Sequence, residues 1–368
     1  MDGTRAPDII VIGGGIVGTA AAAFLAAEGA RVMLVERDGL AAGASGANSG
    51  SVQHPFDPVL TQLYHPTLSL YQALAEEMPG FRIDSRPAGL LLLAHDETTV
   101  RDEADAMTSA YPYLNTEVLG GAALQAIEPA LAPDLWGCLF NLAYPIAPGS
   151  GTYAYATLAE ERGVVIRAGR AAELEVEGDR VVGVRVDGRI FRADAVLAAA
   201  GPGTSALLDP TGRWTPIAPV WGVVAETGHA ARGGLVLESV EPNGPGGLNF
   251  HYVLCDGAAS VGSTHLGEEP VPADWTERVL VNAARFLPAI ADAPIRSLRA
   301  CPRPQSADDR PLIGWVPGLR GLAVCAGHGP WGVSTGPGSA RLAADLLLGR
   351  SPSIPAELDP ARFGAPRG

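Results

Sequence analysis

The first 36 residues show two continuous apolar runs on either side of an alanine-rich segment. Residues 9–12 and 31–35 are apolar runs of strand length, and residues 16–27 carry the small and apolar side chains of a buried helix. Short apolar runs of this kind are typical of strands that are covered on both faces. The pattern therefore predicts a strand, a helix and a second strand, in that order.

Three glycines join the first predicted strand to the helix. Gly13, Gly15 and Gly18 have the G-x-G-x-x-G spacing, and Glu36 follows the second strand. The first glycine of such a turn permits the tight bend, the second lets backbone N–H groups approach a pyrophosphate, and the third lets the helix pack closely on the strand. A helix N-terminus stabilises phosphate charge, and an acid such as Glu36 accepts ribose hydroxyls. The sequence predicts a dinucleotide site; a tight turn without a ligand is the alternative.

Similar patterns continue along the chain. Apolar residues at helical spacing predict a helix over residues 58–78, and we predict further helices over 97–111 (a polar surface helix), 152–162, 275–286 and 337–348. We predict strands over residues 89–94, 164–167, 171–176, 181–186, 193–199, 296–303 and 322–325, and mostly strands from 216 to 261. We predict an α/β fold, α+β overall, in which a discontinuous Rossmann-type domain (1–80, 146–214 and 300–368) carries an inserted, mainly antiparallel β domain (81–145 and 215–299).

Composition narrows the classes of function. The 368 residues are enough for two domains, and the net charge of −14 argues against nucleic acids and anionic membrane surfaces as partners. The four cysteines show no metal-ligand spacing, which suits a reducing compartment. The sequence contains no apolar run of the roughly 18 residues that a membrane span needs, and its first seven residues are polar, unlike a signal peptide. We expect a cytoplasmic protein without a metal site.

Four further segments carry a family resemblance. Residues 44–50 read Ala-Ser-Gly-Ala-Asn-Ser-Gly, residues 198–201 close a strand with Ala-Ala-Ala-Gly, residues 303–314 begin Arg-Pro-Gln-Ser-Ala-Asp-Asp, and residues 327–338 begin Gly-His-Gly-Pro-Trp-Gly. With the N-terminal glycine turn, they resemble the D-amino acid oxidase superfamily of FAD-dependent enzymes. The similar branch includes glycine oxidase, monomeric sarcosine oxidase, D-amino acid dehydrogenase and the flavin subunits of opine-type dehydrogenases. The resemblance implies bound FAD and a substrate site in the inserted domain.

The motifs and the resemblance together define the expected cofactor contacts. These contacts are Gly13, Gly15, Ile16, Val17, Gly18, Glu36, Arg37, Ala44, Ser45, Asn48, Ser49, Gly50, Val165, Ala199, Gly201, Cys301, Arg303, Gly327, His328, Gly329, Gly332, Val333, Ser334 and Thr335. The small residues at 44–50 are suited to wrapping around a cofactor, with a flexible linker as the alternative.

The late glycine-rich loop has a physical interpretation of its own. It runs into a predicted helix whose N-terminus we place between Thr335 and Gly338. Reduced flavin carries negative charge on its pyrimidine ring, and the partial positive charge of a helix N-terminus stabilises that anion. An ordinary turn before a C-terminal helix is the alternative.

Three residues are the expected catalytic groups. A planar guanidinium binds both oxygens of a carboxylate, and Arg303 matches, by the resemblance, the arginine that glycine oxidase and D-amino acid dehydrogenases use for this purpose. Tyr252 loosely matches a tyrosine that supports the same carboxylate, and His328 lies within the flavin loop. A surface arginine and a core tyrosine remain the alternatives. We expect His251 and His265 to be structural.

Cys301 leaves the attachment of the flavin open. Counted from Asp308 and Asp309, it falls where monomeric sarcosine oxidase carries its flavin-linked cysteine. The neighbouring Pro-Arg-Pro sequence follows the glycine oxidase pattern, which favours non-covalent FAD.

The resemblance implies FAD-dependent oxidation of an amino acid or secondary amine to an imine, with O2 or another electron acceptor reoxidising the flavin. A flavin subunit of a heteromeric opine-type or hydroxyproline-type dehydrogenase is one alternative. An ordinary NAD-dependent dehydrogenase is another, although it leaves the late flavin-type loop unexplained. The sequence leaves open whether the protein forms a homo-oligomer or binds a partner subunit.

Overall fold

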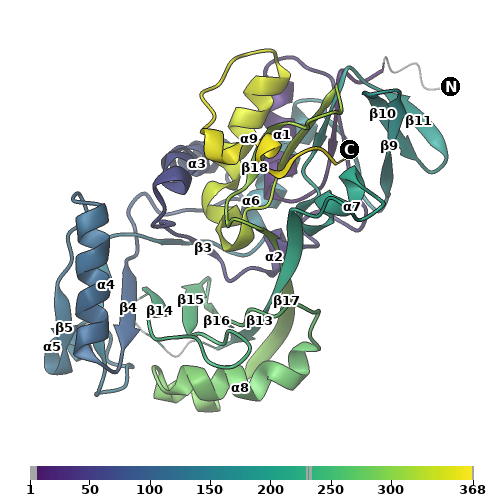
Figure 1. The fold of residues 1–368 in the computed structure, drawn as a ribbon. Helices are drawn as coiled ribbons and strands as arrows, with labels where there is room; N and C mark the ends of the chain where they lie inside the picture. The colour runs from purple at the N-terminus through teal and green to yellow at the C-terminus, as the bar shows by residue number, and fades with distance from the viewer. Residues whose placement is uncertain (1–5, 229–230, 232–233, 367–368) are drawn as a thin grey trace.

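The computed structural model describes residues 6–228, 231 and 234–366, so most of the polar N-terminal segment lies outside it. The chain forms two connected bodies (Figure 1). One is built around a six-stranded sheet and the other around an eight-stranded sheet. The fold is of the mixed α/β class that the sequence predicts.

The six-stranded sheet has the order β18-β19-β12-β1-β2-β8. Its central strand β1 (Ile9–Ile12) pairs in parallel with β2 (Val32–Val35) and β12 (Ala195–Ala198). β8 (Val165–Arg167) and β19 (Leu322–Ala326) extend the sheet in parallel, and β18 (Leu312–Trp315) is an antiparallel edge. Every residue of β1 is buried, as a sheet covered on both faces requires.

Helices cover one face of this sheet and a small antiparallel sheet covers the other. The helices are α1 (Ile16–Ala27), α3 (Pro58–Glu77), α6 (Ser150–Glu161) and α9 (Gly332–Leu347), which pack against one another. Ile9 and Val11 face this helical core, whereas Ile10 and Ile12 face the other side. There they pack with residues of β10 (Arg180–Val186), which lies between β9 (Ala172–Glu177) and β11 (Arg189–Arg192).

The eight-stranded sheet has the order β17-β13-β16-β15-β14-β4-β6-β5. All of its pairs are antiparallel except β14 with β4, so two distant stretches of chain form one sheet. Its strands are β17 (Ile295–Ser306), β13 (Ile217–Thr227), β16 (Ala258–Gly262), β15 (His251–Cys255), β14 (Val236–Ser239), β4 (Leu90–Ala94), β6 (Trp136–Phe140) and β5 (Val118–Gly120). The helices α4 (Glu97–Ala110) and α8 (Pro272–Ala284) belong to this body (Figure 1).

Short helices, one short strand pair and several 3₁₀ turns complete the fold. They are α2 (Ala44–Ala47), α5 (Gly121–Ile127), α7 (Thr204–Leu208), the strand pair β3 (Ser51–Val52) and β7 (Tyr144–Pro145), and the 3₁₀ turns η1 (Gly201–Gly203), η2 (Pro288–Asp292), η3 (Gly329–Trp331), η4 (Ala356–Leu358) and η5 (Pro360–Phe363). Helix α2 forms within the segment of small residues at 44–50, for which no helix was predicted. No helix in the described part of the chain is both long and apolar enough to cross a bilayer.

The predicted start of the last helix was wrong, because α9 begins at Gly332 and contains Pro337. Proline has no N–H, so the carbonyl of Val333, four residues earlier, lacks its usual donor within the helix. The hydroxyl of Tyr71 in α3 donates to that carbonyl at 3.1 Å. A contact from another helix thus replaces the bond that Pro337 removes.

The predicted domain boundaries remain a proposal. β17 runs through the proposed boundary between residues 299 and 300, and it pairs with β13 over its length. We propose that this strand joins the two domains, with its second half lying at the dinucleotide-binding body.

Tyr71→Phe tests the contact that supports α9. Since it leaves the Val333 carbonyl without a donor, we expect it to lower the free energy of unfolding by about 1–3 kcal/mol. Denaturant titration of the holoprotein measures this loss.

Tyr155→Phe is the matched control, because the Tyr155 hydroxyl makes only a 3.4 Å contact with the Leu70 carbonyl, which lies within α3. Equal losses in the two variants would contradict the special role of Tyr71.

Candidate active site

A cavity of about 840 Å³ lies between the six-stranded sheet and one face of the eight-stranded sheet. Its wall includes the turn after β1, the first residues of α1 and α9, helix α2 and the turn η1. Residues of β14, β15 and β17 complete the wall. The cavity thus lies at the carboxyl ends of parallel strands, where α/β sheets bind their ligands.

The turn after β1 brings backbone atoms to the cavity. Gly13 has a φ of 120°, and a Cβ there would collide with the carbonyl oxygen of Ala199. Gly15 caps α1, whose first N–H groups have no partner within the helix and lie at the cavity. One of them, on Ile16, donates to Ser45 Oγ at 2.9 Å.

Glu36 holds the glycine turn in place. Its Oε2 accepts the Gly14 N–H at 2.6 Å and its Oε1 accepts the Asp38 N–H at 2.8 Å. Each carboxylate oxygen has two lone pairs, so both retain capacity for a ribose hydroxyl. Gly14, which sequence reasoning assigned no role, has its N–H in this contact, and a Cβ there would lie 2.8 Å from Glu36 Cγ.

Asn48 ties the segment around α2 into a closed loop. Its Nδ2 donates to the carbonyls of Ala44 at 3.1 Å and Ser45 at 2.6 Å, while its Oδ1 accepts the Gly50 N–H at 2.8 Å. Gly50 closes this loop from behind the wall, with a φ of 83°. The segment is therefore a fixed part of the cavity, and the linker interpretation is set aside.

The N-terminus of α9 faces the same cavity. Gly332, Val333 and Ser334 line it, and Ser334 Oγ accepts the backbone N–H of Gln53 at 2.8 Å. Since α9 begins at Gly332, the positive end of its dipole lies beside these residues. Two helix N-termini, those of α1 and α9, thus lie at one cavity.

His328 is fixed by a contact with α9. Its Nε2 lies 3.0 Å from Ser339 Oγ, whose hydroxyl donates to the Thr335 carbonyl at 2.9 Å. His328 Nε2 therefore carries the proton and donates to Ser339. Burial lowers the pKa of His328 to about 4, so its imidazole is neutral at pH 7.

Most of the predicted cofactor residues line the cavity, and five do not. Those at the wall are Gly13, Gly15, Ile16, Val17, Glu36, Arg37, Ala44, Ser45, Asn48, Ser49, Ala199, Gly201, Cys301, Arg303, His328, Gly329, Gly332, Val333 and Ser334. Gly18, Gly50, Gly327 and Thr335 lie behind it: a Cβ at Gly18 would collide with the Gly13 carbonyl, so Gly18 serves helix packing.

Val165 was predicted to contact the cofactor, and the structure corrects this prediction. The residue is 48% exposed on the edge strand β8. Arg170, Ala171 and Ala172, which follow that strand, line the cavity instead. Residues 170–172 reach the cavity in place of Val165 because the chain turns back after β8. At that turn the Arg170 N–H donates to the Glu36 carbonyl at 2.8 Å.

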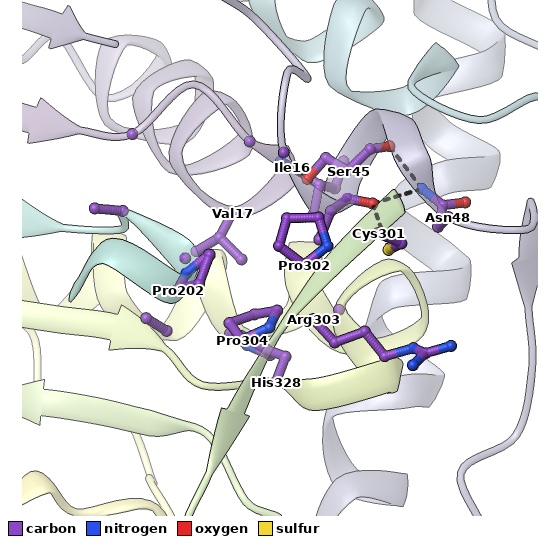
Figure 2. Close-up of a pocket in the computed structure, with 18 of the residues that line it drawn as sticks. Ile16, Val17, Ser45, Asn48, Pro202, Cys301, Pro302, Arg303, Pro304 and His328 are labelled. Carbon is purple, nitrogen blue, oxygen red and sulfur yellow. Dashed lines mark hydrogen bonds between the residues drawn. The ribbon is translucent and has the colours of Figure 1, made fainter. Parts of the chain in front are cut away.

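Arg303 lies on β17 with its guanidinium over the eight-stranded sheet. Nη1 donates to the Thr264 carbonyl at 2.8 Å and Nη2 donates to Ser263 Oγ. Figure 2 shows the side chain extended, with the guanidinium far from Pro304 and His328. Burial lowers the pKa of Arg303, yet an arginine of this kind stays charged.

Gly222 of β13 makes room for this guanidinium. A Cβ at that position would lie 2.7 Å from Arg303 Cζ and 2.7 Å from Ser263 Oγ. Among the described residues, no carboxylate forms a salt bridge with Arg303, whose hydrogen-bond partners are neutral oxygens. The cavity therefore holds a half-buried cation able to bind a ligand's carboxylate.

Tyr252 was predicted to be a catalytic group, and the structure corrects this prediction as well. Side chains alternate across a strand, so His251 and Asn249 line the cavity while Tyr252 points to the opposite face. Tyr252 is fully buried there, and its hydroxyl accepts the Ala231 N–H at 3.2 Å. The alternative interpretation, a core tyrosine, fits this position. His265 also lines the cavity.

Cys301 lies at the wall on the same face of β17 as Arg303. Its thiol is 4.0 Å from the Ala44 carbonyl (Figure 2). Burial raises the pKa of Cys301, and this effect outweighs the opposing influence of Arg303 and Arg299. A raised pKa leaves little thiolate, which is the reactive form.

The cavity fits FAD in shape and chemistry. Glycine backbone and a helix N-terminus suit the pyrophosphate, Glu36 suits the ribose, and the N-terminus of α9 suits the anionic ring. Ser51 lines the wall, and its Oγ is buried without a hydrogen-bond partner. A bound ligand would supply such a partner.

Comparison with known proteins decides the family. The sequence matches the family described as FAD dependent oxidoreductase over residues 8–346. The chain belongs to this family. It is 32% identical to a glycine oxidase of Pseudomonas aeruginosa over 98% of each chain. It is 28% identical to a D-amino acid dehydrogenase of Methylobacterium radiotolerans, over 94% of this chain and 97% of that one.

A solved structure agrees with this assignment. Glycine oxidase from Geobacillus kaustophilus superposes with a TM-score of 0.84 at 25% identity, covering 98% of this chain and 99% of that chain. The protein is an FAD-dependent amino acid oxidoreductase, and its cofactor is FAD. The nicotinamide alternative is thereby set aside.

Sequence reasoning missed several residues of the flavoenzyme's cavity. Gln53, Glu238, Asn249 and Ser263 all line it. Three of them belong to the eight-stranded sheet or its loops, where the sequence carries no motif. Gly222 gave one weak signal, because an isolated glycine inside a strand pattern marks a close approach of another group.

Gly222→Ala tests whether the space above Gly222 positions the Arg303 guanidinium. The added methyl group displaces Arg303, so we expect the dissociation constant of a simple carboxylate such as propanoate to rise at least tenfold while the FAD content stays unchanged. Titration of the flavin absorbance measures both.

Gly80→Ala is the control, because Gly80 has open space around it. An unchanged affinity for propanoate in Gly222→Ala would contradict the proposed role of Gly222 in positioning Arg303.

Acid precipitation tests the attachment of the flavin. Because Cys301 is buried with a raised pKa, we expect the FAD to remain in the supernatant and the pellet to be colourless. A yellow pellet that Cys301→Ser makes colourless would instead establish a covalent bond to this thiol.

Proposed function

We propose that the protein oxidises the Cα–N bond of an amino acid, primary or N-substituted, to an imine that water hydrolyses to a keto acid or aldehyde. One observation carries the proposal: the half-buried guanidinium of Arg303 faces the flavin cavity, and its hydrogen-bond partners there are neutral oxygens. A cation withdrawn from water in this way is stabilised by an anionic ligand. A carboxylate is the anion that an amino acid brings.

The residues of the chain orient the substrate. Arg303 binds the carboxylate through the N–H groups that Thr264 and Ser263 do not use, and those two residues fix the plane of the guanidinium. When bound, FAD supplies the hydride acceptor at its N5 atom. The substrate loses a hydride from Cα while the nitrogen lone pair closes the C=N bond, and water then adds to the carbon and releases ammonia or an amine.

We propose a positioning role for His328. Its Nε2 proton is used by Ser339 and its pKa is about 4. A side chain held in this way stabilises the loop before α9, and it is a poor proton acceptor at pH 7. The names of the relatives include both an oxidase and a dehydrogenase, so the electron acceptor is either O2 or another molecule.

Anaerobic mixing with single amino acids tests the reaction. We expect at least one α-amino acid to bleach the flavin absorbance, with one equivalent of keto acid or aldehyde formed per flavin. Rapid return of the colour in air then indicates an oxidase, and slow return with fast reduction of a dye indicates a dehydrogenase. No bleaching by any primary or N-substituted amino acid would reject the proposal.

Arg303→Leu tests the carboxylate clamp. A charge-assisted hydrogen bond of this kind contributes about 1.5–3 kcal/mol, so we expect kcat/KM to fall roughly 10- to 150-fold for every amino acid substrate.

The control is Arg296→Leu on the same strand, since Arg296 is exposed and donates to the Gly257 carbonyl. Unchanged kcat/KM in Arg303→Leu with full FAD content would contradict the clamp.

A further inference from the structure

The substrate side of the cavity carries a second charged group, Glu238 of β14. In the antiparallel register Glu238 stands opposite His251, so the two side chains share one face of the sheet. Both line the cavity, together with Arg303. The same face thus presents a cation and an anion to whatever occupies it.

The two charges are set apart. Arg303 reaches Ser263, which directly follows β16, whereas Glu238 lies on β14, two strands further across the sheet. Two spacings between strands place these backbones about 10 Å apart. His251 of β15 lies between them: burial lowers its pKa, while Glu238 acts to raise it and Arg303 to lower it further. Within the described chain, Arg303 and Glu238 do not form a salt bridge with each other.

Gln53 holds the carboxylate in position. Its Nε2 donates to Glu238 Oε2 at 2.7 Å, and its backbone N–H donates to Ser334 Oγ at 2.8 Å. Gln53 is buried, with 7% of its surface exposed. One residue therefore links the carboxylate to the first turn of α9, and the carboxylate retains lone pairs for a further donor.

We propose that Glu238 determines the charge of the accepted substrate: an amino acid that carries a basic nitrogen beyond the reacting one. This inference rests on the proposed oxidation of amino acids. Arg303 takes the carboxylate and Glu238 takes the distal cation. A neutral side chain would desolvate Glu238 without compensation, and a second carboxylate would be repelled.

Three unreactive ligands of similar chain length test the inference without turnover. Pentanoate, 5-aminopentanoate and pentanedioate share a carboxylate for Arg303 and differ at the far end, which is a methyl, an ammonium or a carboxylate group. Titration of the flavin absorbance of the holoenzyme should show that 5-aminopentanoate binds at least tenfold more tightly than pentanoate, with pentanedioate weakest.

Glu238→Gln should bring the three dissociation constants to within about threefold of one another. Gln53→Leu, which removes the hydrogen bond but keeps the charge, should weaken 5-aminopentanoate more than pentanoate. Glu268→Gln is the control, because Glu268 is exposed and lies outside the cavity wall.

Equal binding of pentanoate and 5-aminopentanoate by the native protein would overturn the inference, as would a preference that survives Glu238→Gln. Flavin reduction by lysine and by norleucine, each as both enantiomers, gives the second readout. Lysine should reduce the flavin at least tenfold more efficiently, and Glu238→Gln should abolish the difference. An equal loss for both substrates would place Glu238 at the reacting amino group and overturn the inference.

The two proposals fail in different ways. If the ligands bind in the expected order but no amino acid bleaches the flavin, the charge preference stands and the oxidation is wrong. If neutral amino acids bleach the flavin as well as basic ones do, the oxidation stands and the role of Glu238 is wrong.

Discussion

The site depends on two helix N-termini that lie at one cavity from opposite ends of the chain. α1 begins after the glycine turn at Gly15, and α9 begins at Gly332. Each carries partial positive charge and backbone N–H groups that have no partner within the helix. A cofactor with a pyrophosphate in its middle and an electron-accepting ring at one end satisfies both. The packing of α1, α3 and α9 fixes their relative position, and Tyr71 satisfies a carbonyl that Pro337 leaves free.

We propose that the second body recognises the charges of the substrate. Its sheet presents one face to the cavity, and strand alternation decides which residues reach it. Gly222 allows a guanidinium to lie close above the strands, and Ser263 and Thr264 hold it. Glu238 places the opposite charge on the same face, and Gln53 connects its carboxylate to α9. In the proposed function, Gln53 therefore connects the carboxylate that selects the substrate to the helix that faces the cofactor.

Local sequence predicted the elements well because each one is set by its own residues. The strand β1, the helix α1 and the strand β2 follow from continuous apolar runs and a glycine turn, and the family resemblance added FAD. The predicted start of the last helix failed at Pro337, where the compensating donor comes from Tyr71, more than 260 residues away. No local pattern contains that partner.

Sequence alone thus determined the order of the elements and the dinucleotide turn, because these depend on neighbouring residues and on spacing, and the family resemblance pointed to the arginine on β17. Only the tertiary structure decided which side chains share the cavity. Tyr252 and His251 are adjacent in the chain, yet strand alternation sends them to opposite faces. Val165 lies on an edge strand that faces outward. Gly222 meets Arg303 through the pairing of β13 with β17, and Gln53 connects Glu238 to α9 by hydrogen bonds. Register across a sheet and contacts between distant segments are properties of the folded chain.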